Sequence, residues 1–293
     1  MKKRTKDEIV FNSINITLLC IGGLIFVLPF IMVLASSFTD ELYLNTHGAV
    51  FFPIEFSLEG YRWLFGLSNT FLRSIGVTVY YSILSVVFAL VINTTFAFAM
   101  TKPNLAGKRI IATYILIPML FSGGLVPTYL IIEKTGLLNT LWSAILPGAF
   151  NTMTVFLLRN YFMSIPSSLT ESATLDGARN VDVLFRIYIP MSKPIYATII
   201  LQTFVSAWNM WMPCLLYIDS EHSHLYTMQY VIRNMLSSSE NIASQLGLGV
   251  TTGIPTQALQ NATIVISIIP IVVIYPFLHK YLINGTIVGA VKG

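Results

Sequence analysis

The sequence predicts an all-α membrane protein with six transmembrane helices and both termini in the cytoplasm. Apolar residues make up 55% of the 293 residues and charged residues only 10%, against roughly 25% in a typical soluble protein. Apolar runs of about 20 residues, the length that a helix needs to cross a bilayer, recur along the chain. Basic residues cluster in alternate connections between these runs, a distribution that indicates membrane topology.

This composition excludes several classes of protein. So few charged groups cannot cover a soluble globule of this size, so a cytosolic enzyme is not the default interpretation. A disordered chain is excluded because it needs low hydrophobicity and high charge. The net charge of +4 comes from basic residues scattered between apolar runs, which favours membrane orientation over binding to nucleic acid.

Six runs are long and apolar enough to span a bilayer. They are Ser13–Ala35, Ser74–Met100, Ile110–Ile132, Leu141–Tyr161, Ile195–Ile218 and Ala262–Ile283. The first run is too long for the core of a cleaved signal peptide, and no small-residue cleavage site follows it. We therefore expect one transmembrane domain over residues 1–293.

The distribution of lysine and arginine orients these spans. With the N-terminus inside, the cytoplasmic segments are 1–12, 101–109, 159–194 and 279–293, and they hold thirteen of the 17 basic residues. Eight of the thirteen acidic residues lie on the opposite side. Both termini are therefore expected in the cytoplasm.

The interior of the spans carries no charge near any midpoint. Carriers driven by protons or sodium usually have an ionisable group there, so its absence indicates that energy enters from elsewhere. The third span is interrupted by Pro118, Ser122–Gly124 and Pro127, and the last by Pro270 and Pro276. Such breaks often line a polar path, with ordinary helix kinking as an equal alternative.

Two predicted extracytoplasmic segments are long, residues 36–70 and 219–261. In the first, the apolar and aromatic residues between Leu58 and Phe65 predict a short interfacial helix with Trp63 in the aromatic belt. These segments could cap the outer mouth or meet an external partner, and a solvated loop is an equal alternative.

The connection at residues 164–194 carries the most information. Ser168 and Glu171 fit a capping box, which predicts a short helix from Leu169 to about Asp176. Gly177 can take the left-handed conformation that ends a helix.

A second helix is predicted over Val181–Tyr188. Asp182 and Arg186 are spaced as an ion pair on one helix face, and Pro190 ends the helix. Its apolar residues are expected to form one stripe: Val181, Leu184, Phe185 and Tyr188. Such a face needs a cover, which is either another subunit or the membrane surface.

This connection contains a family motif. The residues are Glu171-Ser172-Ala173, Asp176-Gly177-Ala178, Ile187 and Pro190. They resemble the EAA loop of the permease subunits of ATP-binding-cassette (ABC) importers, whose pattern is E-A-A, a glycine four residues after the second alanine, and then I-x-L-P. Ser172 and Ile189 depart from the pattern by small changes of shape.

Further stretches are similar to the carbohydrate-type permeases, namely Phe156–Phe162, Ser192–Pro194 and Gly289–Gly293. Residues Met119–Tyr129 and Trp208–Trp211 resemble the oligosaccharide branch, which includes aldouronate and alginate importers. The resemblance covers almost the whole chain. It implies a multi-pass permease of a bacterial cytoplasmic (inner) membrane that imports an oligosaccharide, with acidic ones such as alginate or aldouronate oligosaccharides among the candidates.

The resemblance also implies partners and roles. This chain pairs with a second homologous permease as a heterodimer, a dimer of cytoplasmic ATP-binding subunits binds the loop, and an extracytoplasmic oligosaccharide-binding protein delivers the substrate. ATP and magnesium belong to the ATPase, so no cofactor, metal or catalytic residue is expected in this chain, which is not itself an enzyme. The ATPase-coupling residues are Glu171, Ala173, Asp176, Gly177, Ala178, Ile187 and Pro190.

Polar and aromatic residues interrupt the otherwise apolar fifth span. Amide groups suit sugar hydroxyls, and aromatic rings suit the C–H faces of sugar rings. Gln202 and Asn209 are about two helical turns apart and can share a face with Ser206. The predicted substrate path is Tyr129, Asn151, Gln202, Ser206, Trp208, Asn209 and Trp211. Helix–helix hydrogen bonding together with an outer aromatic belt is an equal alternative.

Two other functions remain open, a self-contained secondary carrier or channel and an intramembrane enzyme. The uncharged span interiors count against the first, and the lack of a nucleophile–base set counts against the second. His222 and His224 are expected to be exposed polar residues, because no carboxylate–histidine constellation surrounds them. Cys20 and Cys214 lie in apolar runs, which indicates packing and no disulfide or metal site.

Overall fold

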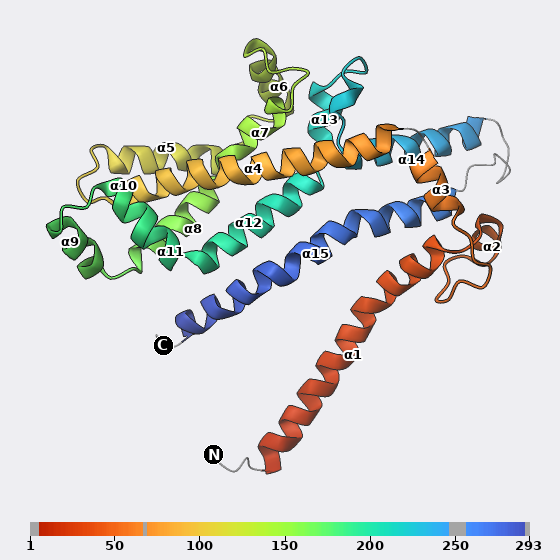
Figure 1. Ribbon diagram of the computed structural model, residues 1–293, viewed down its shortest axis with the longest axis horizontal. Coiled ribbons are helices and arrows are strands. Elements are labelled where there is room, and N and C mark those ends of the chain that lie inside the picture. Colours follow the sequence, from red (N-terminus) through yellow and green to blue (C-terminus); the bar gives the residue numbers. More distant parts are fainter. Residues whose placement is uncertain (1–5, 67–68, 246–255, 291–293) are drawn as a thin grey trace. The chain divides into compact units, whose positions relative to one another are not determined.

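The computed structural model describes residues 6–66, 69–245 and 256–290. In these ranges the backbone forms helices, with one isolated bridge between Thr39 and Phe56 as the only β-type pairing, which confirms the all-α prediction. In chain order (Figure 1) the helices are α1 (Lys6–Ser37), α2 (Glu41–His47), α3 (Glu59–Gly66), α4 (Asn69–Thr101), α5 (Lys108–Leu120), α6 (Leu125–Lys134), α7 (Trp142–Ala149), α8 (Thr152–Met163), α9 (Ser167–Leu175), α10 (Asn180–Val183), the π-helical η1 (Leu184–Tyr188), α11 (Ile189–Met191), α12 (Lys193–Trp208), α13 (Met212–Tyr217), the 3₁₀-helical η2 (Ser223–Leu225), α14 (Met228–Gln245) and α15 (Thr256–Ala290).

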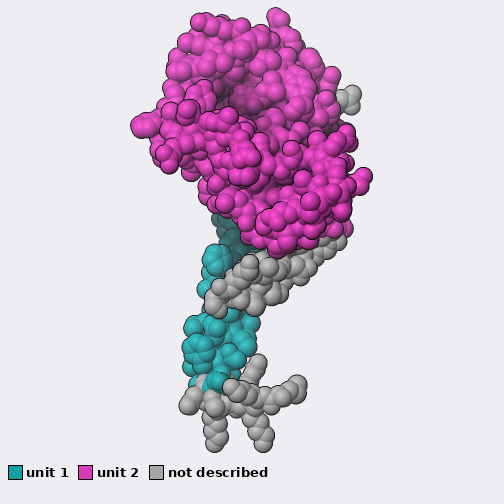
Figure 2. Space-filling view, turned by 90° about the vertical axis from the view of Figure 1, so that its left-hand side faces the viewer, with its two compact units in different colours: residues 1–69, 234–269 teal, residues 70–233, 270–293 magenta. Residues whose placement is uncertain are grey.

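Two compact units make up the chain, residues 1–69 with 234–269 and residues 70–233 with 270–293 (Figure 2). Within the described ranges, the helical segments that are long and apolar enough to cross a membrane are Val10–Ser37, Thr70–Thr101 and Gln257–Phe277, and a bent pair formed by α5 and α6 makes a fourth candidate. Val291–Gly293, the last three residues of the predicted cytoplasmic segment 279–293, lie outside the described residues.

The first unit contains α1, α2, α3, the larger part of α14 and the beginning of α15. α1 covers the whole first predicted span, and only 6% of its most apolar stretch is buried within the chain. A helix that is apolar around its circumference buries its surface in lipid or against another subunit. α3 confirms the short helix predicted between Leu58 and Phe65.

The N-terminus of α15 is held by α2 and α3. The Glu41 carboxylate accepts hydrogen bonds from the backbone N–H groups of Gln257 (3.0 Å) and Ala258 (2.8 Å), which otherwise lack partners in the first turn. Gly60 packs so closely that a Cβ at this position would lie 2.6 Å from the carbonyl oxygen of Ala258. The glycine is therefore needed for the approach of α3 to α15.

α4 buries one of its faces within the second unit. Its buried face carries small polar residues at helical spacing, including Ser74, Thr78 and Ser82. The hydroxyls of Ser74 and Thr78 donate to carbonyls of the preceding turn, Phe71 at 2.7 Å and Ser74 at 2.8 Å. Small side chains let neighbouring helices approach closely in a membrane, where the hydrophobic effect does not drive helix association.

The third predicted span is broken, as its sequence predicts. α5 and α6 meet at 117° across Phe121–Gly124. Gly124 takes a positive φ of 84°, a conformation that costs glycine little, so the turn forms at the glycine pair.

The fourth and fifth predicted spans are also broken, although neither contains a glycine pair. α7 ends at Ala149 and α8 begins at Thr152, and α12 ends at Trp208 with α13 beginning at Met212.

The last predicted span, in contrast, forms one unbroken helix. α15 continues through Pro270 and Pro276, so of the two alternatives the broken helix is wrong there and a continuous helix is observed. Each proline removes one backbone donor, and membrane helices tolerate this loss without ending.

The break between α7 and α8 is closed by Asn93 of α4. Its side-chain amide nitrogen donates to the carbonyl oxygens of Ala149 (2.8 Å) and Ala89 (2.6 Å), and its oxygen accepts from the N–H of Asn151 (2.9 Å). Asn151 in turn caps α8, since its side-chain oxygen accepts from the N–H of Thr154 (2.9 Å). Asn93 is fully buried. Its amide therefore replaces backbone hydrogen bonds that the break removes.

Replacing Asn93 by leucine should destabilise the protein. The substitution keeps the side-chain size but removes the partners of the Ala149 carbonyl and the Asn151 N–H. We expect a loss of about 1–3 kcal/mol in the free energy of unfolding, the cost of leaving buried polar groups unpaired. Thermal unfolding of the purified protein in detergent measures this loss.

Thr95→Val on the same helix is the matched control, because the exposed Thr95 hydroxyl bonds only to carbonyls of its own helix. Equal melting temperatures for the two variants would contradict the bridging role of Asn93.

Candidate functional site

The connection between α8 and α12 folds into two helical segments. α9 confirms the first predicted helix, but the predicted capping box of Ser168 and Glu171 is wrong. The helix begins at Ser167, so Ser168 already lies inside its first turn, and within this described segment no side chain caps the helix at Pro166. The exposed Glu171 carboxylate thus has no capping role and is available to another partner.

The turn after α9 is built on Gly177, as predicted. Gly177 has a φ of +82°. Its N–H donates to the carbonyl of Thr174 (3.0 Å), and the N–H of Ala178 donates to the carbonyl of Ala173 (2.9 Å). These two bonds satisfy carbonyls at the end of the helix and set the direction in which the chain leaves it.

The second helical segment runs through α10, η1 and α11. Asp182 does not pair with Arg186, so this prediction is wrong. Its carboxylate instead accepts from the guanidinium (3.1 Å) and the backbone N–H (3.2 Å) of Arg179, which precedes the first helical residue. The hydrogen bond from the Arg179 side chain lowers the pKa of Asp182. A free N–H at the start of a helix is a nearer partner than a side chain one turn along.

The predicted apolar stripe divides into two faces. Leu184 and Tyr188 are buried, whereas Val181 is 59% exposed and Phe185 61% exposed. Residues Leu184–Tyr188 form a π-helical turn, which holds more residues than an α-helical turn. Leu184 and Tyr188, four residues apart, share the inward face, and Val181 and Phe185, also four residues apart, share a face turned away from it, so only one of the two faces is covered.

Tyr188 anchors the loop to the long helices. Its ring packs edge-on against Phe98 of α4 (centroids 5.1 Å apart) and Phe162 of α8 (5.2 Å). Its hydroxyl lies 3.3 Å from that of Thr170 on α9, which ties the two loop segments together. The buried Val183 joins the same cluster. The sequence placed Tyr188 in an apolar stripe but gave no sign of its role as an anchor.

The motif residues divide between this core and the surface. Ala173, Ala178 and Ile187 are half-buried against the core, whereas Glu171, Asp176, Gly177 and Pro190 are exposed. Leu175 is 89% exposed at the end of α9. Beside it, Ala173, Asp176, Gly177, Asp182 and Arg186 contribute to a recess of about 510 Å³. The surface of the loop therefore combines an apolar side chain, carboxylates and a concavity.

The predicted path residues occupy different environments. Gln202, Ser206 and Asn209 are all exposed, which agrees with one shared face. Trp208 is buried and stacks on Phe204, with ring centroids 5.7 Å apart. Tyr129 lies near Tyr217 (6.1 Å between centroids), and the exposed Asn151 is the helix cap described above. Their role as a sugar path stays a prediction.

The break between α12 and α13 brings further residues to Asn209 and Trp211. The side-chain amide of Gln229 donates to the side-chain oxygen of Asn209 (3.3 Å), and the Arg233 guanidinium lies 3.8 Å from the centre of the Trp211 ring. Gln229 and Arg233 are not among the residues that the sequence predicts for this region. Their spacing of four residues on α14 places them on one helix face, but only the fold brings that face to the break.

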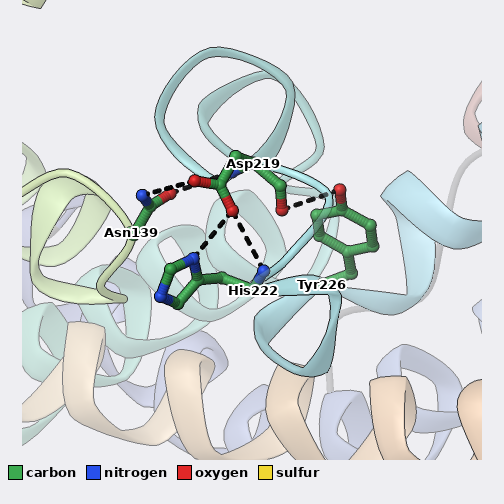
Figure 3. Close-up of polar contacts among 4 residues, drawn as sticks. All are labelled: Asn139, Asp219, His222 and Tyr226. Carbon is green, nitrogen blue, oxygen red and sulfur yellow. Dashed lines mark hydrogen bonds and ion pairs between the residues drawn. The ribbon is translucent and has the colours of Figure 1, made fainter.

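A polar network joins the α6–α7 connection to the one between α13 and α14 (Figure 3). Asn139 and Asp219 exchange two hydrogen bonds of 2.7 and 2.9 Å, and Tyr226 donates to the Asp219 carbonyl at 3.0 Å. The His222 ring lies 2.7 Å from the same carboxylate and lowers the pKa of Asp219. This network fixes two connections that are 80 residues apart in sequence.

Comparisons with known proteins identify the family. No family model matches the chain. Over 289 residues it is 36% identical to protein LplC of Bacillus subtilis, covering 99% of this chain and 97% of that protein. Over 294 residues it is 33% identical to the polygalacturonan/rhamnogalacturonan transport system permease protein YtcP of the same species, covering both chains in full. The chain belongs to the permease subunits of sugar ABC importers.

Solved structures agree with this assignment. A chain of a bacterial ABC transporter involved in the import of the acidic polysaccharide alginate superposes with a TM-score of 0.80 at 30% identity, covering 96% of this chain and 99% of that one. A bacterial alginate ABC transporter in complex with an alginate pentasaccharide-bound periplasmic protein shares the fold, with a TM-score of 0.56 at 17% identity, covering 94% and 96%. This sugar permease is therefore a multi-pass protein of the inner membrane.

Gly177→Val should increase the population of opened conformations of the loop between α8 and α12. No atom lies within 4 Å of a Cβ added at Gly177, so the penalty comes from the backbone conformation alone. A left-handed conformation costs an ordinary residue about 1–2 kcal/mol. We expect cleavage of the loop by a protease to become about 5–30-fold faster, in proportion to the population of the opened loop.

Gly177→Asn is the control, because asparagine tolerates the left-handed region. Equal cleavage of the valine and asparagine variants would show that this conformation does not hold the loop together.

Proposed function

We propose that this chain is one of two permease subunits of an ATP-driven importer that moves an oligosaccharide across the cytoplasmic membrane. The observation that carries the proposal is the loop between α8 and α12, which presents an exposed surface on one side and is anchored by Tyr188 in the packing of the long helices on the other. Together with family membership, this geometry supports coupling to a separate ATPase.

The proposed topology has six spans with both termini in the cytoplasm. The third span corresponds to α5 with α6, the fourth to α7 with α8, and the fifth to α12 with α13. The distribution of basic residues supports this orientation, and it places the loop on the cytoplasmic side.

The loop transmits force in the proposed mechanism. A dimer of cytoplasmic ATP-binding subunits, which hold ATP and magnesium, contacts Glu171, Asp176 and the exposed Leu175. When the ATPase dimer closes on ATP, the loop moves with it. Packed interiors are stiff and transmit displacement, so the Tyr188 contacts with Phe98 and Phe162 carry this movement to α4 and α8. The permease itself performs no catalysis.

The exposed surface of α1 and the similar proteins support two further partners, a second permease and a binding protein. The exposed apolar surface of α1 contacts lipid and the second permease. A periplasmic protein bound to an alginate pentasaccharide accompanies the alginate transporter of similar fold, which supports an extracytoplasmic binding protein here. The names of YtcP and of the alginate transporter both refer to acidic polysaccharides, and this supports an oligosaccharide with acidic residues as substrate.

Changes on the exposed loop surface should weaken ATPase binding. Leu175→Ser removes an apolar contact, and Glu171→Lys reverses a charge on the same helix. Each variant should retain less than about a tenth of the ATPase in a pull-down from membranes, because a loss near 1.4 kcal/mol lowers binding tenfold.

Phe52→Ser serves as control, because Phe52 is 79% exposed on a predicted extracytoplasmic segment. Retention of the ATPase by all three variants at the unmodified level would refute loop docking.

The purified chain alone should neither hydrolyse ATP nor transport sugar. Its span interiors carry no coupling charge, so energy has to come from the ATPase. Uptake of labelled oligosaccharide into liposomes should require the second permease, the ATPase, ATP and the binding protein. Uptake by this chain alone would favour the self-contained carrier over the importer.

A further inference from the structure

The exposed Arg233 and the half-buried Trp211 form a cation–π pair. The guanidinium lies 3.8 Å from the centre of the indole ring, and Arg233 has no ion pair with a carboxylate in the part of the chain that the structure describes. A guanidinium that stacks on a ring still presents its N–H groups at its edge. These groups are oriented for a planar acceptor from outside the chain, of which a carboxylate is the best match.

Two amides lie beside this pair. Gln229 donates to Asn209 at 3.3 Å, which uses one N–H of Gln229 and one acceptor site of Asn209. The Asn209 amide nitrogen donates to the carbonyl of Val205 (3.0 Å), which fixes its orientation at the end of α12. A primary amide has two donors and two acceptor sites, so both residues keep capacity for sugar hydroxyls.

Buried contacts hold the two segments in register. The Thr227 hydroxyl donates to the carbonyl of Met210 at 2.7 Å, and the N–H of Met228 donates to the hydroxyl of Thr78 at 2.8 Å. Thr227, Thr78 and Met228 are fully buried. The start of α14 is therefore fixed against both α4 and the break after α12, and these buried contacts preorganise the four side chains Asn209, Trp211, Gln229 and Arg233.

We propose that Arg233, Trp211, Asn209 and Gln229 form a subsite for a carboxylated sugar residue, a uronate, of the transported oligosaccharide. This inference rests on the proposed function and adds the chemistry of the substrate. Arg233 binds the carboxylate, the amides bind ring hydroxyls, and the indole contacts a C–H face. In the proposed topology, α14 lies on the extracytoplasmic side, so the subsite meets the sugar before it enters the membrane.

The subsite is testable with matched sugars. The complete importer, with its ATPase, second permease and binding protein, is reconstituted in liposomes, and uptake is measured for trisaccharides of galacturonate and mannuronate, for their methyl esters and for a neutral arabinotriose. Methyl esters keep the shape of the acid and remove its charge. One preparation of binding protein serves every permease variant, so differences between variants belong to the permease.

Arg233→Gln should lower the uptake efficiency of at least one acidic trisaccharide by about tenfold, the scale of one charge-assisted bidentate contact, and leave its methyl ester within about twofold. Arg233→Lys should recover part of the loss, because it keeps the charge and loses the planar fork. Arg62 is an exposed arginine on α3, and Arg62→Gln should leave the uptake of both the acid and its methyl ester unchanged.

The outcomes separate the two proposals. Equal losses for acid and ester in Arg233→Gln would overturn the uronate subsite, because a purely structural arginine would affect both alike. Uptake of arabinotriose alone by the unmodified importer would also overturn it while leaving the oligosaccharide importer intact. Failure of the complete importer to take up any of these sugars would count against the proposed substrate class itself.

Discussion

The hydrogen bonds of Asn93 are the interaction on which the arrangement of the second unit depends. Within a bilayer, a broken helix leaves backbone groups without partners, and water cannot replace them. One buried amide from α4 satisfies both sides of the α7–α8 break, accepting from the N–H of Asn151 and donating to the carbonyl of Ala149. Because the same residue also bonds to its own helix at Ala89, the break is fixed relative to α4. These hydrogen bonds therefore fix the direction in which the chain continues from α7 into α8.

The loop after α8 depends on that packing. Tyr188 packs against both Phe98 of α4 and Phe162 of α8. A displacement of the loop therefore displaces these two helices, and a displacement of the helices displaces the loop. The surface on the other side of the loop is left exposed, with Leu175 and Glu171 as examples. The proposed coupling to an ATPase depends on this combination of a stiff inner attachment and an open outer face. The segment Leu184–Tyr188 provides both, since Leu184 and Tyr188 face inward and Phe185 faces outward.

Several of the residues predicted to bind the sugar lie at breaks between consecutive helices. Asn151 lies at the α7–α8 break, and Asn209 and Trp211 lie at the α12–α13 break. A continuous helix would direct such residues toward lipid or another helix, whereas a break exposes them together with a neighbouring segment. At the second break that segment is α14, whose Gln229 and Arg233 supply an amide and a cation.

The sequence by itself determined the membrane class, the family, the position of the loop helices and the left-handed turn at Gly177, because these follow from composition, a local motif and the conformational freedom of glycine. Only the tertiary structure decided the rest. Pro147 and Pro213 lie near the breaks after Ala149 and Trp208, but partners distant in sequence, Asn93 and Thr227, stabilise these breaks. Asp182 pairs with Arg179 because a free N–H lies nearer than Arg186. Arg233 reaches Trp211 because packing, and not sequence spacing, brings α14 to the break.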